Sequence, residues 1–460
     1  MSLRETILWL VCALACAPCA FAENDVVSNV VSLSPQPTRY TLQQCIDRAL
    51  EQNPDVLVAK KYLEEAAGAI VVARAGFLPS LTSYANYEKL EANYATLGGS
   101  VNNRSEIWNV NIRLTEAIYA GGAVRAGMEI ARLQQHSRTL DYEGAINQVI
   151  MDVRIAFYDI LRNQSDVAVH EQAVNFLAEQ VKNEQARLEV GTGQKLNVLR
   201  AEVNRALEQS ALVDARNRLR NSWLRLSELL SIPYSVDQER VPFDVDGKLV
   251  HEKTALELDD CLSRALVQRP ELAARENDIN VQKKQLIVDH SQLLPHVSLF
   301  AGYDVVSEPD RSQSADYFEG YLGGVSVSWQ LFDGFATRGR MNATRARVEA
   351  AEVSHDAVYR SIETDVLLAW HDLQRSEENI GTQTANVQLA ADSLKLATAN
   401  FDTGLTSQLE VLQSQLDLTR AQTAELSARF EYNAALARLD RAMGSHFQIT
   451  DARPRGKGSP

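Results

Sequence analysis

An apolar residue recurs at every seventh position in two separate stretches of the chain, and this spacing constrains the fold more than any other feature. The second stretch repeats the first at an offset of 213 residues, so the chain holds two copies of one pattern. The first seam consists of Val153, Ile160, Val167, Val174, Val181 and Leu188, and the second of Val366, Leu373, Ile380, Val387, Leu394 and Phe401. A seam of this period faces a neighbouring helix along its length only if the helices supercoil with a left hand. We therefore expect long coiled helices.

Each seam ends at a glycine, Gly191 in the first copy and Gly404 in the second, and a leucine-containing helical pattern follows. A glycine just past a periodic segment is a common signal for the end of a helix. We expect two helical hairpins, within residues 124–230 and 337–443. Because the stripe between the seam residues is narrow and made mostly of small residues, these helices should pack laterally, as staves do.

The composition excludes several classes of protein. The 460 residues are 45% hydrophobic and 23% charged, which suits a large ordered structure. The net charge of −14, without a cluster of Lys or Arg, argues against a nucleic-acid partner. The sequence shows no pairing of a nucleophile with a general base that would indicate an enzyme. Its histidines and methionines are not spaced as metal ligands are. We therefore expect no catalytic residues, no metal and no cofactor.

Residues 1–22 have the pattern of a secretory signal peptide, with Arg4, an apolar run and a small-residue site ending at Ala22. The alternative is lipidation at Cys16, but Ala13 stands where a lipobox usually has leucine. Beyond the signal, Cys45 and Cys261 occupy equivalent places in the two copies. Two small buried thiols are favoured over a disulfide, because equivalent positions in two halves usually lie farther apart than the ~7 Å that a disulfide allows.

The hydrophobic period changes from helix to strand in residues 79–118 and 295–332. Apolar Val110, Ile112 and Leu114 alternate with polar side chains, and the same two-faced pattern recurs in the second copy. A half-buried sheet of a soluble protein has this period too, but the signal peptide and the lack of a broad apolar helical layer favour a transmembrane β-barrel segment. Because four strands cannot close a barrel and an open edge in lipid is costly, several copies must pool their strands, as a dimer or a trimer.

These patterns predict an internally duplicated chain that is mainly α with a membrane β-barrel segment. The expected organisation is a signal peptide (1–22), an extended lead-in (23–40), a first repeat (41–230, with helices 41–76, strands 79–118 and a long hairpin 124–230), a connector (231–255), a second repeat (256–445, with helices 256–292, strands 295–332 and a long hairpin 337–443), and a flexible tail (446–460).

The sequence resembles the TolC-like family of outer membrane efflux proteins, also called outer membrane factors. The most specific motif lies at the second turn and reads Phe401, Gly404, Ser407, Glu410, Val411, Leu412. Leu-Pro at both helix-to-strand junctions, residues 78–79 and 294–295, adds to the resemblance. It implies a homotrimer with a 12-stranded barrel in the outer membrane lipid of a Gram-negative bacterium and a periplasmic α-barrel. It also implies a periplasmic adaptor (membrane fusion) protein and an inner-membrane RND, ABC or MFS transporter as partners.

In this family the hairpin turns form a constricted gate and dock the adaptor. The resemblance places the docking tips at Gly191, Thr192, Gly193, Leu196, Gly404, Leu405, Ser407 and Leu409, and the pore constriction at Glu410, Gln413, Asn197, Phe401 and Thr406. Some relatives carry two acidic residues where this chain has Glu410 and Gln413, so one ring of three carboxylates is expected. The basic and acidic residues that lock some relatives are replaced here by Thr406 and Asn197, which leaves gating to packing and to Glu410.

Glu410 also has a purely structural interpretation. Ser407 and Glu410 are spaced as a capping box, in which the carboxylate reaches back to the Ser407 backbone N–H. On function, the resemblance implies the passive exit duct of a tripartite efflux or type I secretion system. The alternative is a secreted structural coiled-coil surface protein or adhesin, which would not be expected to carry duplicated two-faced strands.

Overall fold

The computed structural model describes residues 38–89, 106–233, 243–249, 256–307 and 317–444. The expected signal peptide, most of the lead-in, parts of the connector and the tail from residue 446 lie outside these ranges. The chain divides into a unit ending at Thr38 and a compact unit beginning at Arg39, and the description below concerns the second. Among the helices of the described residues, none has a stretch long and apolar enough to cross a membrane.

The first repeat contains two short helices and one long helical hairpin. They are α2 (Leu42–Gln52), α3 (Pro54–Ala75), α4 (Ala123–Glu189) and α5 (Lys195–Leu229). The sequence signals at the start of α2 are realised as a capping box, in which Thr41 Oγ1 accepts from the Gln44 N–H and the Gln44 side chain accepts from the Thr41 N–H. Asn53 caps α3, whose first residue is Pro54, as expected for a proline at this position.

The second repeat contains the same elements with the same lengths. They are α6 (Leu258–Gln268), α7 (Pro270–Ser291), α8 (Ala336–Asp402) and α9 (Gln408–Ala442). Helices α4 and α8 are both 67 residues long, and α5 and α9 are both 35. The duplication expected from the two seams is therefore confirmed. We call α4–α5 the first hairpin and α8–α9 the second hairpin.

Four strands, two from each repeat, form one antiparallel sheet. They are β2 (Ser80–Lys89), β3 (Glu106–Ala120), β5 (His296–Ser307) and β6 (Tyr317–Ser328), in the order β2-β3-β5-β6. The two repeats thus join through β3 and β5, while β2 and β6 stand at the edges without a further partner among the described strands. A smaller sheet pairs β1 (Thr38–Tyr40) with β4 (Phe243–Val245).

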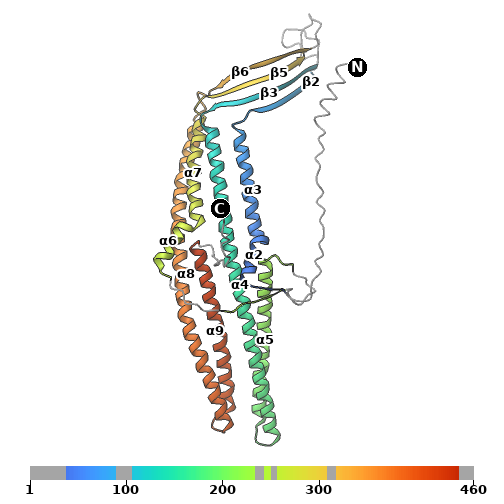
Figure 1. Ribbon diagram of the computed structural model, residues 1–460, viewed down its shortest axis with the longest axis vertical. Helices are drawn as coiled ribbons and strands as arrows, with labels where there is room; N and C mark the ends of the chain where they lie inside the picture. Colours follow the sequence, from blue (N-terminus) through green and yellow to red (C-terminus); the bar gives the residue numbers. More distant parts are fainter. Residues whose placement is uncertain (1–37, 90–105, 234–242, 250–255, 308–316, 445–460) are drawn as a thin grey trace, which may run out of the picture. The chain divides into compact units, whose positions relative to one another are not determined.

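The helices pack side by side beneath the four-stranded sheet (Figure 1). Helix α3 packs on α4, α4 on α7 and α7 on α8, while α4 also contacts α9 and so joins the two hairpins. Each repeat has its own apolar core, one containing Val153 and Ile160 and the other containing Val366 and Leu373. The seams are therefore buried where they begin. Toward the turns their burial varies: Val174 and Leu394 are half-buried, whereas Val181 is buried.

Candidate functional site

Both hairpins turn at the same end of the molecule in Figure 1, and the two turns are built alike. Gly191 and Gly404 both have φ of +79°, in the left-handed region where glycine avoids a steric cost. The residue after each glycine donates its backbone N–H five residues back, with Thr192 N to Arg187 O at 2.9 Å and Leu405 N to Asn400 O at 2.8 Å. This is a Schellman ending, which satisfies carbonyls at the helix C-terminus.

The two turns differ two residues after the glycine. Gly193 donates a second backbone bond to Arg187 O at 2.8 Å, and a Cβ there would lie 2.8 Å from Leu188 N, so only glycine fits. The equivalent residue of the second turn is Thr406, whose hydroxyl donates to Glu410 Oε2 at 2.5 Å. The first turn is thus closed by backbone contacts, and the second carries a side-chain contact to the start of α9.

Arg187 links the two hairpins at this end. Its guanidinium lies over the Phe401 ring, 4.3 Å from the centroid, and its Nη2 is 3.7 Å from Asp402 Oδ1. Within its own helix, Nη1 is 3.8 Å from Glu184 Oε1. The ion pair to Asp402 is exposed and contributes little, whereas a cation over an aromatic face contributes ~0.5–1 kcal/mol at such a site. We call Glu184, Arg187, Phe401 and Asp402 the Arg187 cluster.

Two buried polar side chains near the turns are incompletely hydrogen-bonded. Glu184 is 1% exposed and its Oε1 has no hydrogen-bond partner among the described residues. Gln408, the first residue of α9, is 3% exposed, and within the described chain both of its amide atoms lack a partner. A buried polar group left unsatisfied costs ~1–3 kcal/mol. The unsatisfied groups of Glu184 and Gln408 therefore oppose the contacts that stabilise this arrangement of the turns.

Glu410 does not cap its helix. Ser407 is the N-cap of α9, but no side-chain capping bond is present there, and the Glu410 carboxylate accepts from the Thr406 hydroxyl instead. The capping-box interpretation is therefore wrong, because the Thr406 hydroxyl, and not the Ser407 backbone N–H, is the donor to this carboxylate. Gln413, the position where a second acid was expected, is exposed and donates to Asp417 Oδ1 at 3.1 Å. Asn197 lies half-buried in the first turn of α5.

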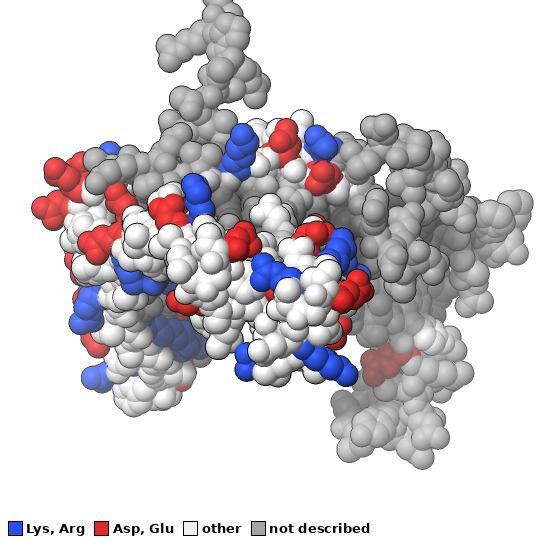
Figure 2. All heavy atoms as spheres, turned by 90° about the horizontal axis from the view of Figure 1, so that it is seen from below, with Lys and Arg blue, Asp and Glu red and all other residues white. Residues whose placement is uncertain are grey.

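The tips also expose large apolar side chains. Leu196 is 51% exposed, Leu405 79% and Leu409 56%. Figure 2, which looks at the molecule from the end that carries the turns in Figure 1, shows Lys and Arg interspersed with Asp and Glu among uncharged residues. The surface at this end therefore mixes both signs of charge with exposed leucines.

Sequence reasoning overlooked Arg187, and with it the link between the hairpins. The sequence expectation concerned the position after the second turn, where Thr406 stands and carries no charge. The structure places the cation before the first turn and the aromatic and acidic groups before the second. The repeat offset of 213 makes Arg187 equivalent to Asn400, which directly precedes Phe401. This equivalence was the one sequence feature that could have indicated that Arg187 and Phe401 lie at the same level.

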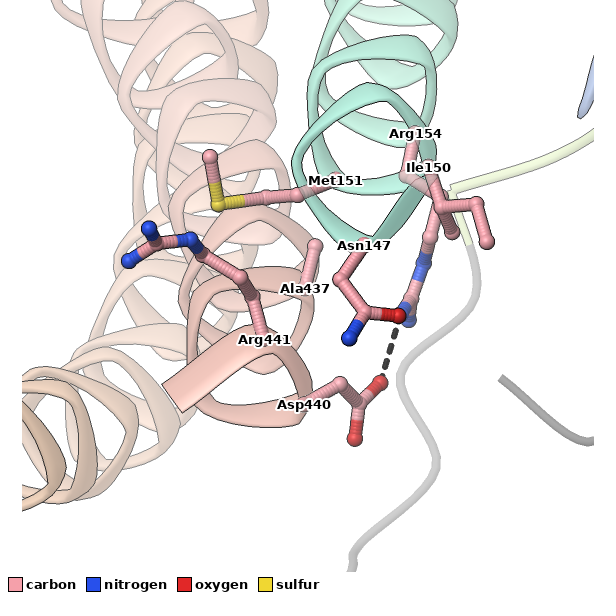
Figure 3. A pocket seen from close by; sticks show the side chains of 7 residues that line it. All are labelled: Asn147, Ile150, Met151, Arg154, Ala437, Asp440 and Arg441. Atoms are coloured by element: carbon pink, nitrogen blue, oxygen red, sulfur yellow. Dashed lines mark hydrogen bonds and ion pairs between the residues drawn. The ribbon is translucent and has the colours of Figure 1, made fainter. Parts of the chain in front are cut away.

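Two cavities border the contact between α4 and α9. The larger, about 520 Å³, is lined by polar residues that include Asp166, His170, Glu208 and Arg420. Inside it, His170 Nδ1 lies 2.6 Å from Glu208 Oε1, which joins α4 to α5 within the first hairpin. The smaller, about 10 Å³ and drawn in Figure 3, has room for about one water molecule. Its lining residues Asn147 and Asp440 face each other from α4 and α9.

Both repeats match one protein family. The family model described as "Outer membrane efflux protein" matches residues 45–231 and 261–445. The outer membrane efflux protein BepC of Brucella suis biovar 1 (strain 1330) is 20% identical over 409 residues, which cover 88% of this chain and 85% of the relative. The outer membrane protein TolC of Vibrio cholerae serotype O1 is 22% identical over 411 residues, covering 88% of this chain and 90% of the relative.

Solved structures show the same fold. The outer-membrane channel OprN superposes with a TM-score of 0.76 and 19% identity, covering 88% of this chain and 90% of that chain. The CmeC outer membrane channel of Campylobacter jejuni gives a TM-score of 0.76 with 16% identity, covering 88% of this chain and 85% of that chain. At these identities the likeness establishes the fold alone. The mainly helical architecture with two repeats and a shared sheet, expected from the sequence, is confirmed.

Proposed function

The chain belongs to the outer membrane efflux protein family, and from this we propose that its paired hairpin turns form the gate of the exit duct. Membership makes the chain an outer membrane efflux channel of the kind used in tripartite efflux and type I secretion, and not an enzyme. It also sets aside the alternative of a secreted coiled-coil adhesin, because the matched regions span both repeats.

The family implies a trimeric channel that works with efflux pumps. We propose that three copies pool their strands into a 12-stranded barrel. Supporting this, β2 and β6 are edge strands without a further partner among the described residues, and a membrane barrel tolerates no open edge. Pairing β2 of one copy with β6 of the next closes the sheet. The expected division into signal peptide, repeats and connector stands as part of the same proposal.

The gate proposal rests on the Arg187 cluster. This cluster joins the two hairpins near their tips, with the cation on the first hairpin and the aromatic and acidic groups on the second. Separating the hairpins would break this contact. We propose that the same separation admits water to Glu184 and Gln408, which would supply the hydrogen bonds they lack. The Arg187 contact favours the closed arrangement and the hydration of Glu184 and Gln408 favours the open one. Both free-energy contributions are small, as a gate requires.

Single-channel conductance in planar bilayers tests this gate. Arg187→Ala removes the cation and should raise the conductance of the purified channel, because the hairpins lose their link. Arg205→Ala, which removes an exposed arginine elsewhere on the first hairpin, is the matched control and should leave the conductance unchanged. Equal conductance in wild type and Arg187→Ala would show that the Arg187 cluster does not hold the gate.

We further propose that the exposed leucines of the tips, Leu196, Leu405 and Leu409, dock a periplasmic adaptor protein that couples the duct to an inner-membrane RND, ABC or MFS transporter. Their exposure supports this, since large apolar side chains gathered on an exposed surface often mark a protein–protein contact. Leu405→Glu should abolish export by cells while leaving conductance in bilayers intact. Loss of both would indicate a folding defect, and loss of neither would contradict the docking site.

A further inference from the structure

One face of the four-stranded sheet is polar, and the described strand residues place a single lysine or arginine on it, Arg113 of β3. The register puts Thr82, Arg113, Gly302 and Leu322 in one row across the four strands, so their side chains lie on one face. The opposite face carries exposed apolar residues such as Leu114 and Val325. In a membrane barrel the apolar face meets lipid and the polar face lines the lumen. Arg113 therefore belongs to the lumen.

The side chain of Arg113 can extend toward either diagonal neighbour on β5, because Gly302, the residue directly opposite it, has no side chain. A side chain at Gly302 would not fit, since its Cβ would lie 2.7 Å from Ile112 O. Diagonal neighbours across two strands are within reach of long and aromatic side chains. Arg113 accordingly contacts both diagonal residues of β5, lying over the Phe300 ring at 5.7 Å from its centroid and 4.0 Å from Asp304.

The Phe300 ring is seated by a second glycine. Gly324 of β6 pairs with Phe300, and a Cβ there would lie 3.1 Å from Phe300 Cζ. The ring therefore lies across the Gly324 backbone, where a larger residue would displace it. Phe300 is half-buried in the single chain and keeps part of its surface open on the lumen side. Arg113 and Phe300 thus form one ledge, fixed in place by the two glycines.

The ledge keeps an available positive charge. The ion pair between Arg113 and Asp304 is long, and the two side chains are 44% and 32% exposed. Ion pairs of this kind contribute little, and they leave the guanidinium accessible to solvent, although Asp304 Oδ1 itself is buried. A guanidinium presents five N–H donors, of which one carboxylate at this distance engages few. An anionic group in the lumen could therefore bind Arg113 while an attached aromatic ring stacks on Phe300.

We propose that three copies of the Arg113–Phe300 ledge form a collar inside the membrane barrel, and that this collar contacts aromatic anions as they pass. The inference rests on the proposed trimeric duct. It adds a second place at which the channel discriminates among transported molecules, remote from the gate at the turns. A 12-stranded barrel is narrower than the 16- to 18-stranded barrels that leave a wide aqueous channel. Three large side chains at one level therefore reduce its opening substantially.

Block of single-channel current by naphthalene-2-sulfonate tests the collar. The probe is added in turn to each chamber of a planar bilayer that holds the purified full-length channel. Loss of a stacked cation and ring pair weakens binding by about fivefold, the equivalent of ~1 kcal/mol. Phe300→Ala and Arg113→Gln should each raise the blocking concentration by about this factor, and Asp304→Asn should lower it. Ser298→Ala, two residues before Phe300 on the same face, should leave it unchanged.

Equal block in wild type, Phe300→Ala and Arg113→Gln would overturn the collar while leaving the proposed duct intact. A preparation of the wild type that forms no channels would instead overturn the duct, and the collar with it. Phe300→Leu, which keeps apolar bulk but removes the aromatic face, provides the same comparison if Phe300→Ala forms no channels.

Discussion

Arg154 of α4 and Asp440 of α9 form an ion pair that joins the first repeat to the second, with Nη1 and Oδ2 2.5 Å apart (Figure 3). The Arg154 side chain is 4% exposed and that of Asp440 is 23% exposed. A charge this deeply buried depends on its counter-ion, because water cannot solvate it. The pair therefore fixes how the first hairpin lies against the second.

Removing the carboxylate should destabilise the chain strongly. Asp440→Ala leaves the Arg154 guanidinium buried without its counter-ion, at a cost of about 3 kcal/mol in the free energy of unfolding. The thermal unfolding midpoint of the purified protein, followed by circular dichroism, measures the effect. The double variant Arg154→Met with Asp440→Leu should recover most of the loss, since apolar replacement of a buried pair is often neutral. Asp365→Ala, which removes a 42% exposed partner of Arg269, is a milder control.

Glu410 should set the ionic preference of the channel. Three copies of this exposed carboxylate, one from each tip, favour cations electrostatically at a narrow entrance. Glu410→Ala should shift the reversal potential in a salt gradient toward that of a non-selective pore. Asp392→Ala removes another exposed carboxylate, on α8 well before the turn, and should preserve the preference. An unchanged reversal potential in Glu410→Ala would contradict the assignment.

The architecture could be predicted from the sequence because its signals are local and repeated. The seven-residue seams, with Val153 and Val366 equivalent, specify long helices whatever lies around them, and the alternation around Ile112 specifies a strand. Pro54, placed after Asn53, marks a helix start by its own backbone geometry. Each of these features depends on residues within a few positions, so no knowledge of packing was needed.

The candidate site was harder to predict because its contacts join distant segments. Arg187 meets Phe401 only because the two hairpins lie side by side at one axial register, which a seam does not specify. The burial of Glu184 and Gln408, both polar, is likewise a property of the folded chain that no local motif indicates. Glu410 had two possible donors within four residues, the Ser407 backbone N–H and the Thr406 hydroxyl, and the sequence could not decide between them. Local motifs therefore located the tips, while the contacts across them required coordinates.

Cys45 should make the stability of the protein depend on alkaline pH. Burial raises the pKa of this thiol from an ordinary value of 9.0 to about 12. The folded state thus holds the proton more tightly, and the contribution to stability is complete below pH 9.0 and is lost as the pH rises toward 12. The unfolding midpoint should fall less steeply over this window in Cys45→Ala than in wild type. Parallel curves for the two proteins would show that Cys45 does not couple to pH.

Gly193→Ala should open the gate without altering any residue of the Arg187 cluster. The new Cβ would lie 2.8 Å from Leu188 N and 2.9 Å from Arg187 C, so the backbone that carries Arg187 must shift. A shift of this kind moves the guanidinium off the Phe401 ring, and the conductance should rise as in Arg187→Ala. Gly381→Ala is the matched control, because nothing lies within 4 Å of a Cβ in the middle of α8. It should leave conductance unchanged and stabilise the helix by ~1 kcal/mol. A raised conductance in both glycine variants would show that the effect is not specific to the turn.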